Sequence, residues 1–334
     1  MEMDYLERRE KKQQSNTINY LRAVAIILVV LHHAMSHGMK YLGEVSPGYS
    51  CFISIISFVH VPLFFMISGY LCHAQDVLKY YRKKFFQIFI PFLVCTSIKL
   101  VVNLIYEEFS HATTAGGEFL KAYIFGEYYW FSYALLVMCC IAPLLWKIKN
   151  KLILIGIILL LFAFNIVNES LGLLRNGGPF QIFNVLVFGI WFLLGYVLNQ
   201  LNAGNLLNKK SVKHIAFLVS IAVSVLMIFL FAKGTLNFFI SKFILSLSIS
   251  YILLYIFSSA HFKIPLLNYI SNYSYQIFLL DSFIKVVLFA VVSKLLSINL
   301  PIIILLAILN VFISIIICFI VRKIKLGKLL LGLS

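Results

Sequence analysis

Apolar segments long enough to cross a lipid bilayer recur along the whole chain. A membrane-spanning helix needs about 20 mostly apolar residues, because its backbone polar groups must be paired within the segment. Ten segments approach or exceed this length, at residues 18–35, 51–71, 86–106, 129–146, 152–167, 181–198, 215–232, 236–257, 270–292 and 300–321. The sequence therefore predicts an all-α, polytopic membrane helical bundle of about ten transmembrane helices.

The placement of charge agrees with a membrane protein. Only 12% of the 334 residues are charged, against about 25% in soluble domains. With the N-terminus inside, nineteen Lys and Arg, among them Lys209 and Lys263, fall on the inner side. The outer loops hold Lys40, Lys121, Arg175, Lys233 and Lys294. This asymmetry predicts that both termini are cytoplasmic, and it explains the net charge of +16 without a nucleic-acid partner.

The same pattern predicts a simple domain organisation. Residues 1–17 mix charges and are expected to form a cytoplasmic N-terminal tail, residues 18–322 one membrane domain, and residues 323–334 a short basic cytoplasmic tail. The long first apolar segment argues against a cleavable signal peptide. The six cysteines contain no C-x-x-C pair, so neither a disulfide framework nor a metal site is expected.

The first apolar segment carries charge where a membrane helix rarely does. It holds Arg22 near its start and His32, His33 and His37 near its end. Eleven residues separate Arg22 from His33, which makes about three turns, so both share one helical face roughly 16 Å apart along the axis. Ionisable groups inside a membrane indicate function by default. The alternative is that Arg22 reaches lipid phosphates and His33 caps the outer helix end.

Three further sites add candidates. His60 lies near mid-membrane just before Pro62, where a break in the helix would open the backbone towards a cavity, and Ser68-Gly69 favours close helix approach. Arg82, Lys83 and Lys84 form a cytoplasmic basic run, which either follows the positive-inside rule or binds a phosphorylated cofactor. Asp281 lies midway along the ninth segment, where it either pairs with Lys285 or orients a catalytic histidine.

These residues resemble a known family. The segment L-R-A-V-A-I-I-L-V-V-L-H-H, with Arg22 and His33, resembles the first-helix signature of the acyltransferase-3 family of integral membrane proteins. F-V-H-V-P-L-F-F-M-I-S-G-Y-L at residues 58–71 resembles the second-helix motif. Weaker similarities follow at Ile90-Pro91-Phe92, Trp130-Phe131 and Ser274-Tyr275.

The resemblance implies a multi-pass protein of the bacterial cytoplasmic membrane that transfers acyl groups, usually acetyl from cytoplasmic acetyl-CoA. The implied acceptor is a cell-surface polysaccharide or its lipid-linked precursor. The family's critical arginine and histidine fall on Arg22 and His33. The chain departs from the family pattern where Lys84-x-x-Gln87 replaces paired arginines and where Asp281 replaces a histidine, and we expect no periplasmic hydrolase-like domain of the kind that some relatives carry.

The expected mechanism places the CoA phosphates against Arg22 and the run Arg82–Lys84. His33 is expected to remove the proton from an acceptor hydroxyl, or to carry a transient acyl group, with His60 or Asp281 as positioning residues. No metal is expected.

Two rival functions and the protein's further partners stay open. A membrane transporter or exporter is the main rival, since intramembrane His, Asp and Lys also form proton relays. A scaffold without activity is the second rival. Self-association and association with polysaccharide assembly proteins stay open.

Overall fold

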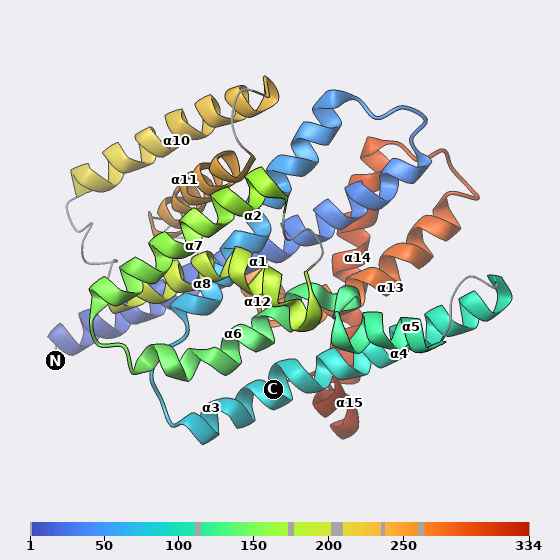
Figure 1. The fold of residues 1–334 in the computed structure, drawn as a ribbon, viewed down its shortest axis with the longest axis horizontal. Coiled ribbons are helices and arrows are strands. Elements are labelled where there is room, and N and C mark those ends of the chain that lie inside the picture. The colour runs from blue at the N-terminus through green and yellow to red at the C-terminus, as the bar shows by residue number, and fades with distance from the viewer. Residues whose placement is uncertain are drawn as a thin grey trace. The chain divides into compact units, whose positions relative to one another are not determined.

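The computed structural model describes residues 2–110, 115–172, 177–201, 210–234, 238–259 and 264–333 (Figure 1). Within these ranges the chain forms helices and connecting turns, and no strand. The elements are α1 (Glu2–Gly38), η1 (Met39–Tyr41), α2 (Pro47–Tyr70), α3 (Val77–Lys84), η2 (Phe85–Phe89), α4 (Ile90–Ser110), α5 (Ala115–Phe119), η3 (Leu120–Ile124), η4 (Glu127–Tyr129), α6 (Trp130–Trp146), α7 (Lys151–Leu171), η5 (Pro179–Gln181), α8 (Ile182–Gln200), α10 (Lys210–Ala232), α11 (Phe238–Ser259), α12 (Pro265–Asn272), α13 (Ser274–Val292), α14 (Leu300–Val321) and α15 (Lys325–Leu330). The elements η2 and η3 are π-helical turns.

Ten helices within the described ranges are long and apolar enough to cross a membrane, which confirms the predicted helical membrane bundle. They cover Gln14–Tyr41, Pro47–Tyr70, Val77–Ile105, Glu127–Trp146, Lys151–Leu171, Pro179–Gln200, Ser211–Ala232, Phe238–Ser259, Ser274–Val292 and Leu300–Val321. Their sidedness and the predicted domain bounds stay predictions. Three of the basic residues behind the predicted orientation, Arg175, Lys209 and Lys263, lie outside the described residues.

The chain divides into two compact units. The first unit comprises Met1–Ile67 and Gln200–Ile316, and the second comprises Ser68–Asn199 and Ile317–Ser334.

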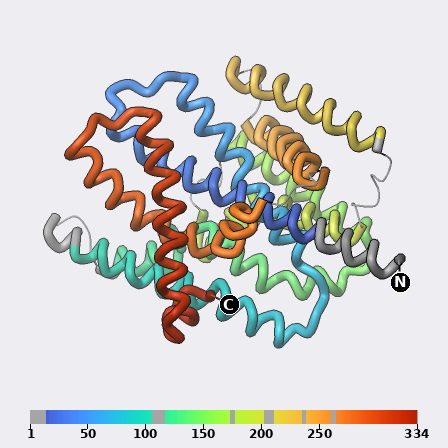
Figure 2. The backbone as a smooth tube through the Cα atoms, turned by 180° about the vertical axis from the view of Figure 1, so that it is seen from behind, coloured from blue at the N-terminus to red at the C-terminus, as the bar shows by residue number. Residues whose placement is uncertain are grey.

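In the first unit, α1 packs against α11, α12 and α13, while α10 packs against α11. Figure 2 shows the blue α1 running beside the orange helices of the same unit. Leu21 and Ala25 of α1 form a buried cluster with Leu63 and Ile67 of α2. Small buried residues such as Ala25 let neighbouring helices approach closely, which is the common basis of helix association in membranes.

In the second unit, α3, η2 and α4 follow one another without a loop. The helices α2 and α8 approach each other at Gly69, where a Cβ atom would lie only 1.9 Å from the carbonyl oxygen of Phe192. This confirms the close helix approach predicted from Ser68-Gly69. Asn199 at the end of α8 also donates a hydrogen bond to the carbonyl of Tyr70, over 2.7 Å.

Some helices extend beyond the expected apolar segments. Helix α1 begins at Glu2, so residues expected as a cytoplasmic tail are helical, and the third candidate span begins at Val77 rather than at residue 86. The ninth segment is interrupted at Tyr273, whose backbone angles (φ −112°, ψ 11°) are not helical and separate α12 from α13. Helix α2 runs through Pro62 without the expected break, since membrane helices tolerate proline where neighbours compensate for the lost hydrogen bond.

Candidate active site

The first unit brings His33 and Asp281 together from opposite ends of the sequence. His33 lies near the end of α1, and Asp281 lies in the second turn of α13. The Nδ1 atom of His33 is 2.6 Å from Oδ2 of Asp281. The carboxylate side chain is 1% exposed, whereas the imidazole is 32% exposed. The buried carboxylate of Asp281 thus contacts one nitrogen of the His33 imidazole, and the imidazole is partly exposed.

Two more donors surround the same carboxylate. The side-chain nitrogen of Asn310, in α14, lies 2.8 Å from Oδ1 of Asp281 and 3.3 Å from the Asp281 backbone carbonyl. Ser314 donates to the Asn310 side-chain oxygen over 3.4 Å, so the amide nitrogen is left to face the carboxylate. The Nζ atom of Lys285 lies 3.8 Å from Oδ2. Asp281 therefore contacts both partners considered from the sequence, and the histidine is the closer one.

This donor set determines which nitrogen of His33 is free. Asn310 donates a hydrogen bond to Oδ1 of Asp281, and the Lys285 ammonium lies within ion-pair distance of Oδ2, an arrangement that matches an ionised carboxylate, which accepts hydrogen bonds only. Nδ1 of His33 then carries the hydrogen of this contact, and in a neutral imidazole this tautomer leaves the lone pair on Nε2. The geometry therefore presents an oriented imidazole with a basic nitrogen, which is what a general base requires.

His60 belongs to the same histidine cluster but does not pair with Asp281. Its Nδ1 donates to the carbonyl of Ile56 over 2.7 Å, and the side chain is buried. Its ring centroid lies 4.9 Å from that of His32, which in turn lies 5.8 Å from that of His33. The buried Nδ1 of His32 has no hydrogen-bond partner among the described residues. His60 is thus separated from His33 by one intervening imidazole.

Arg22 lies on the same continuous helix as His33, three turns towards the N-terminus. Its side chain is half-buried, with buried neighbours at Leu21 and Ala23, and it forms no ion pair with the part of the chain that the structure describes. An unpaired guanidinium in this setting is suited to an anionic ligand, because a partly buried cation is costly without a counter-charge.

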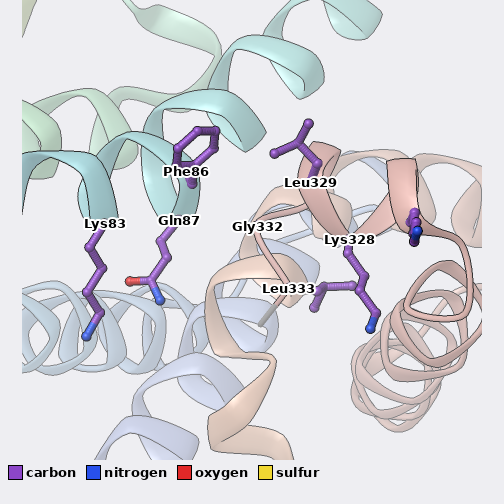
Figure 3. A pocket seen from close by; sticks show the side chains of 8 residues that line it. Lys83, Phe86, Gln87, Lys328, Leu329, Gly332 and Leu333 are labelled. Carbon is purple, nitrogen blue, oxygen red and sulfur yellow. The ribbon is translucent and has the colours of Figure 1, made fainter. Parts of the chain in front are cut away.

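The remaining predicted cofactor residues lie in the second unit, on α3. Arg82 and Lys83 are exposed, and Lys84 is half-buried with its Nζ 5.5 Å from the centre of the Tyr80 ring. Lys83 lines an open pocket of about 440 Å³ together with Gln87, Lys325 and Lys328 (Figure 3). Because Arg22 belongs to the other unit, its predicted grouping with Arg82–Lys84 stays a prediction.

Sequence reasoning missed Asn310, Lys325 and Lys328. Asn310 is a lone amide within the apolar run I-L-L-A-I-L-N-V-F-I of α14, and buried polar groups in such runs need partners. That signal was present in the sequence, but the identity of its partner was not. Within the described ranges, no group of three or more His, Cys, Asp or Glu residues is arranged to hold a metal ion.

A comparison with protein families identifies the class of this chain. The chain matches the acyltransferase domain of the acyltransferase-3 family over residues 15–319. Together with the ten apolar helices, this match defines the class of protein as a multi-pass membrane acyltransferase. The chain belongs to the acyltransferase-3 family, which confirms the resemblance seen in its first two helices. Neither the curated proteins nor the solved structures contain a match to it.

Proposed function

We propose that this protein is an O-acyltransferase of the bacterial cytoplasmic membrane. It moves an acyl group, with acetyl as the expected one, from cytoplasmic acyl-CoA to a hydroxyl of a cell-surface polysaccharide or of its lipid-linked precursor. The observation that carries the proposal is the chain of contacts from Asn310 through Asp281 to His33, in a protein of an acyltransferase family.

His33 acts as the general base in this proposal. Its Nε2 takes the proton of the acceptor hydroxyl while the hydroxyl oxygen attacks the thioester carbonyl. The tetrahedral intermediate then collapses, the carbon–sulfur bond breaks, and the proton passes from Nε2 to the leaving thiolate of CoA. Asp281 keeps the imidazole in the required tautomer and stabilises the imidazolium that forms, a role that carboxylates fill in comparable histidine pairs.

The cations of the chain supply sites for the donor. The half-buried Arg22 is proposed to bind a phosphate of acyl-CoA, because a guanidinium forms strong charge-assisted hydrogen bonds with phosphate oxygens. Lys83 and its neighbours on α3 are proposed to attract the same anion.

The first test replaces His33 by Ala in the purified full-length protein. With acetyl-CoA and an acceptor glycan, both release of free CoA and acetyl incorporation are expected to fall by about 10²- to 10⁴-fold, the range for loss of a general base. The matched control is His73→Ala, which removes an exposed histidine that bonds only the carbonyl of Leu71. Unchanged transfer in the His33 variant would contradict the mechanism. A wild-type protein that consumes no thioester would instead favour transport.

A second measurement identifies the acceptor. Surface glycans from cells with and without the protein are compared by mass spectrometry. Acetyl transfer is expected to add about 42 Da per modified sugar, the mass of one C2H2O unit.

A further inference from the structure

The C-terminal helix completes a basic pocket that the sequence did not predict. Its described lining comprises Lys83, Phe86, Gln87, Lys325, Lys328, Leu329, Gly332 and Leu333. Figure 3 shows Lys83 and Gln87 on one wall and Lys328, Leu329 and Leu333 on the other. All these residues belong to the second unit, and none of the described lining residues carries a carboxylate.

The C-terminal turn packs closely against the rest of its unit, and this packing places the backbone of α15, which carries Lys325 and Lys328, beside the pocket. Gly332 adopts a left-handed backbone (φ 61°), and a Cβ atom there would lie 2.8 Å from Pro91 and 2.9 Å from the carbonyl oxygen of Gln87. The neighbouring side chains of Leu331 and Leu333 are buried. Only glycine combines this conformation with such close approach.

The opposite wall of the pocket is formed by the end of α3 and by the turn η2. Phe86 and Gln87 belong to the π-helical turn η2, and such turns inside helices are frequent at functional sites. Gln87 adds a neutral amide between ammonium groups. Three ammonium groups around one open cavity of about 440 Å³ repel each other, and an anion between them relieves that repulsion.

We propose that this pocket binds a phosphate group, with Lys325 and Lys328 on α15 and Lys83 on α3 as its cationic ligands. Lysine binds phosphate as a compact charge. Two sources present such a group at this membrane side: the nucleotide end of acyl-CoA and the headgroup of an anionic lipid. Assigning the pocket to acyl-CoA rests on the proposed function. In that case the lysines of the C-terminal helix supply the positive charge that Gln87 does not provide.

The test uses the full-length protein purified in detergent and measures equilibrium binding of three probes. These are CoA, dephospho-CoA, which lacks the 3′-phosphate, and phosphatidylglycerol. The double variant Lys325→Gln/Lys328→Gln is expected to bind CoA or phosphatidylglycerol about tenfold more weakly, the loss expected for two solvent-accessible charges. The single variant Lys83→Gln tests the other wall and is expected to weaken binding of the same probe.

The matched control is Lys147→Gln/Lys149→Gln, which removes two exposed lysines between α6 and α7 and is expected to bind every probe as the wild type does. Weaker CoA binding with a smaller effect on dephospho-CoA identifies the nucleotide as the ligand. Weaker binding of phosphatidylglycerol alone identifies the lipid. If the α15 double variant binds all probes as the control does, the pocket proposal is overturned.

The two proposals fail in different ways. A protein that binds CoA through these lysines but neither releases free CoA from acetyl-CoA nor transfers acetyl would overturn the proposed function and keep the pocket. Active transfer, with unchanged CoA affinity and an unchanged KM for acetyl-CoA in the double variant, would overturn the acyl-CoA assignment and keep the function.

Discussion

Asn310 is the residue on which the orientation of the buried carboxylate depends. It donates to Oδ1 of Asp281 and, more weakly, to the Asp281 backbone carbonyl. Oδ2 is thereby left for His33. A buried acceptor that loses its donor costs about 1–3 kcal/mol. In the proposed mechanism, Asn310 therefore acts through Asp281 as a positioning residue.

Replacing Asn310 by Ala is expected to lower kcat by about tenfold to a hundredfold, because the carboxylate loses the donor that fixes its orientation. The KM for acetyl-CoA is expected to stay unchanged, since the Asn310 side chain bonds Asp281 and Ser314 and not the cations that are proposed to bind the donor. Steady-state kinetics on the purified protein separate the two parameters.

The matched control is Asn165→Ala. Asn165 is also a buried amide within an apolar helix, and it donates to the carbonyl of Leu161 over 2.8 Å. A similar loss of thermal stability in both variants, with kcat reduced only at Asn310, supports the positioning role. If both variants have the same kcat, the positioning role is contradicted, and Asn310 contributes only to the stability of the fold.

Glu118 is a second buried carboxylate, in α5 of the second unit. It accepts hydrogen bonds from Lys121, over 2.6 Å, and from the hydroxyl of Tyr128. These bonds, that of Lys121 first, lower the pKa of Glu118 below its ordinary value of 4.5. Since the folded pKa is the lower one, the ionised carboxylate stabilises the fold above pH 4.5, and this contribution disappears as the pH falls through the folded pKa.

Replacing Glu118 by Gln is therefore expected to lower the apparent melting temperature at pH 7, by an amount that corresponds to about 1–2 kcal/mol for charge-assisted hydrogen bonds. The difference from the wild type should shrink as the pH falls below 4.5. Thermal unfolding in detergent across this pH range measures it. The exposed neighbour Glu127→Gln is the control, and its apparent melting temperature at pH 7 should match that of the wild type.

At the scale of elements, the approach of α2 to α8 depends on one glycine. A Cβ atom at Gly69 would meet the backbone oxygen and carbon of Phe192 at 1.9 and 2.7 Å. Backbone atoms of a packed helix cannot rotate away as a flexible side chain does. The two helices must therefore separate to accept any larger residue at this position.

Gly69→Ala is expected to destabilise the protein by about 1–3 kcal/mol, the usual cost of overpacking, and to reduce the folded yield in membranes. Gly156→Ala is the matched control, because it lies inside α7 with no atom within 4 Å of the added Cβ. Apparent melting temperatures of both variants check the prediction. If Gly69→Ala melts as Gly156→Ala does, the close approach does not limit packing.

At the scale of the whole molecule, the even number of candidate spans in the described ranges predicts that both chain ends lie on one side of the membrane, and the basic residues predict that this side is cytoplasmic. Green fluorescent protein fused to either end is expected to fluoresce, because it matures in the cytoplasm. A phosphatase that needs the periplasm should be active when inserted at residues 43–46, in the first outer loop. Fluorescence from one end only would contradict the predicted topology.

Much of this architecture could be predicted from the sequence alone. Apolar runs mark the helices, because a span must be about 20 residues long to cross the hydrocarbon core. The ends of the helices were harder to predict: α1 continues through polar residues to Glu2, and Tyr273 interrupts a run that reads as continuous. Hydropathy indicates which segments can lie in lipid. It does not predict local backbone angles or how far a helix continues into water, so the helix ends could not be predicted from it.

Part of the candidate site could also be predicted from the sequence, and part could not. Arg22 and His33 could be identified from one helix, because their spacing along a regular helix fixes their shared face. The contact between His33 and Asp281 joins residues 248 positions apart, and Asn310 adds a third helix to it. Likewise, Lys325 and Lys328 line one pocket with Lys83 because the C-terminal turn packs against η2, and this contact could not be predicted from the sequence.

The sequence by itself determined that this protein is a helical membrane protein of the acyltransferase-3 family, with a cation and an imidazole on one face of its first helix. Only the tertiary structure decided which carboxylate holds that imidazole, which amide holds the carboxylate, and which lysines gather around one pocket. The physical reason is that periodicity and length act within a helix, whereas contacts between helices depend on how each helix rotates and packs against its neighbours.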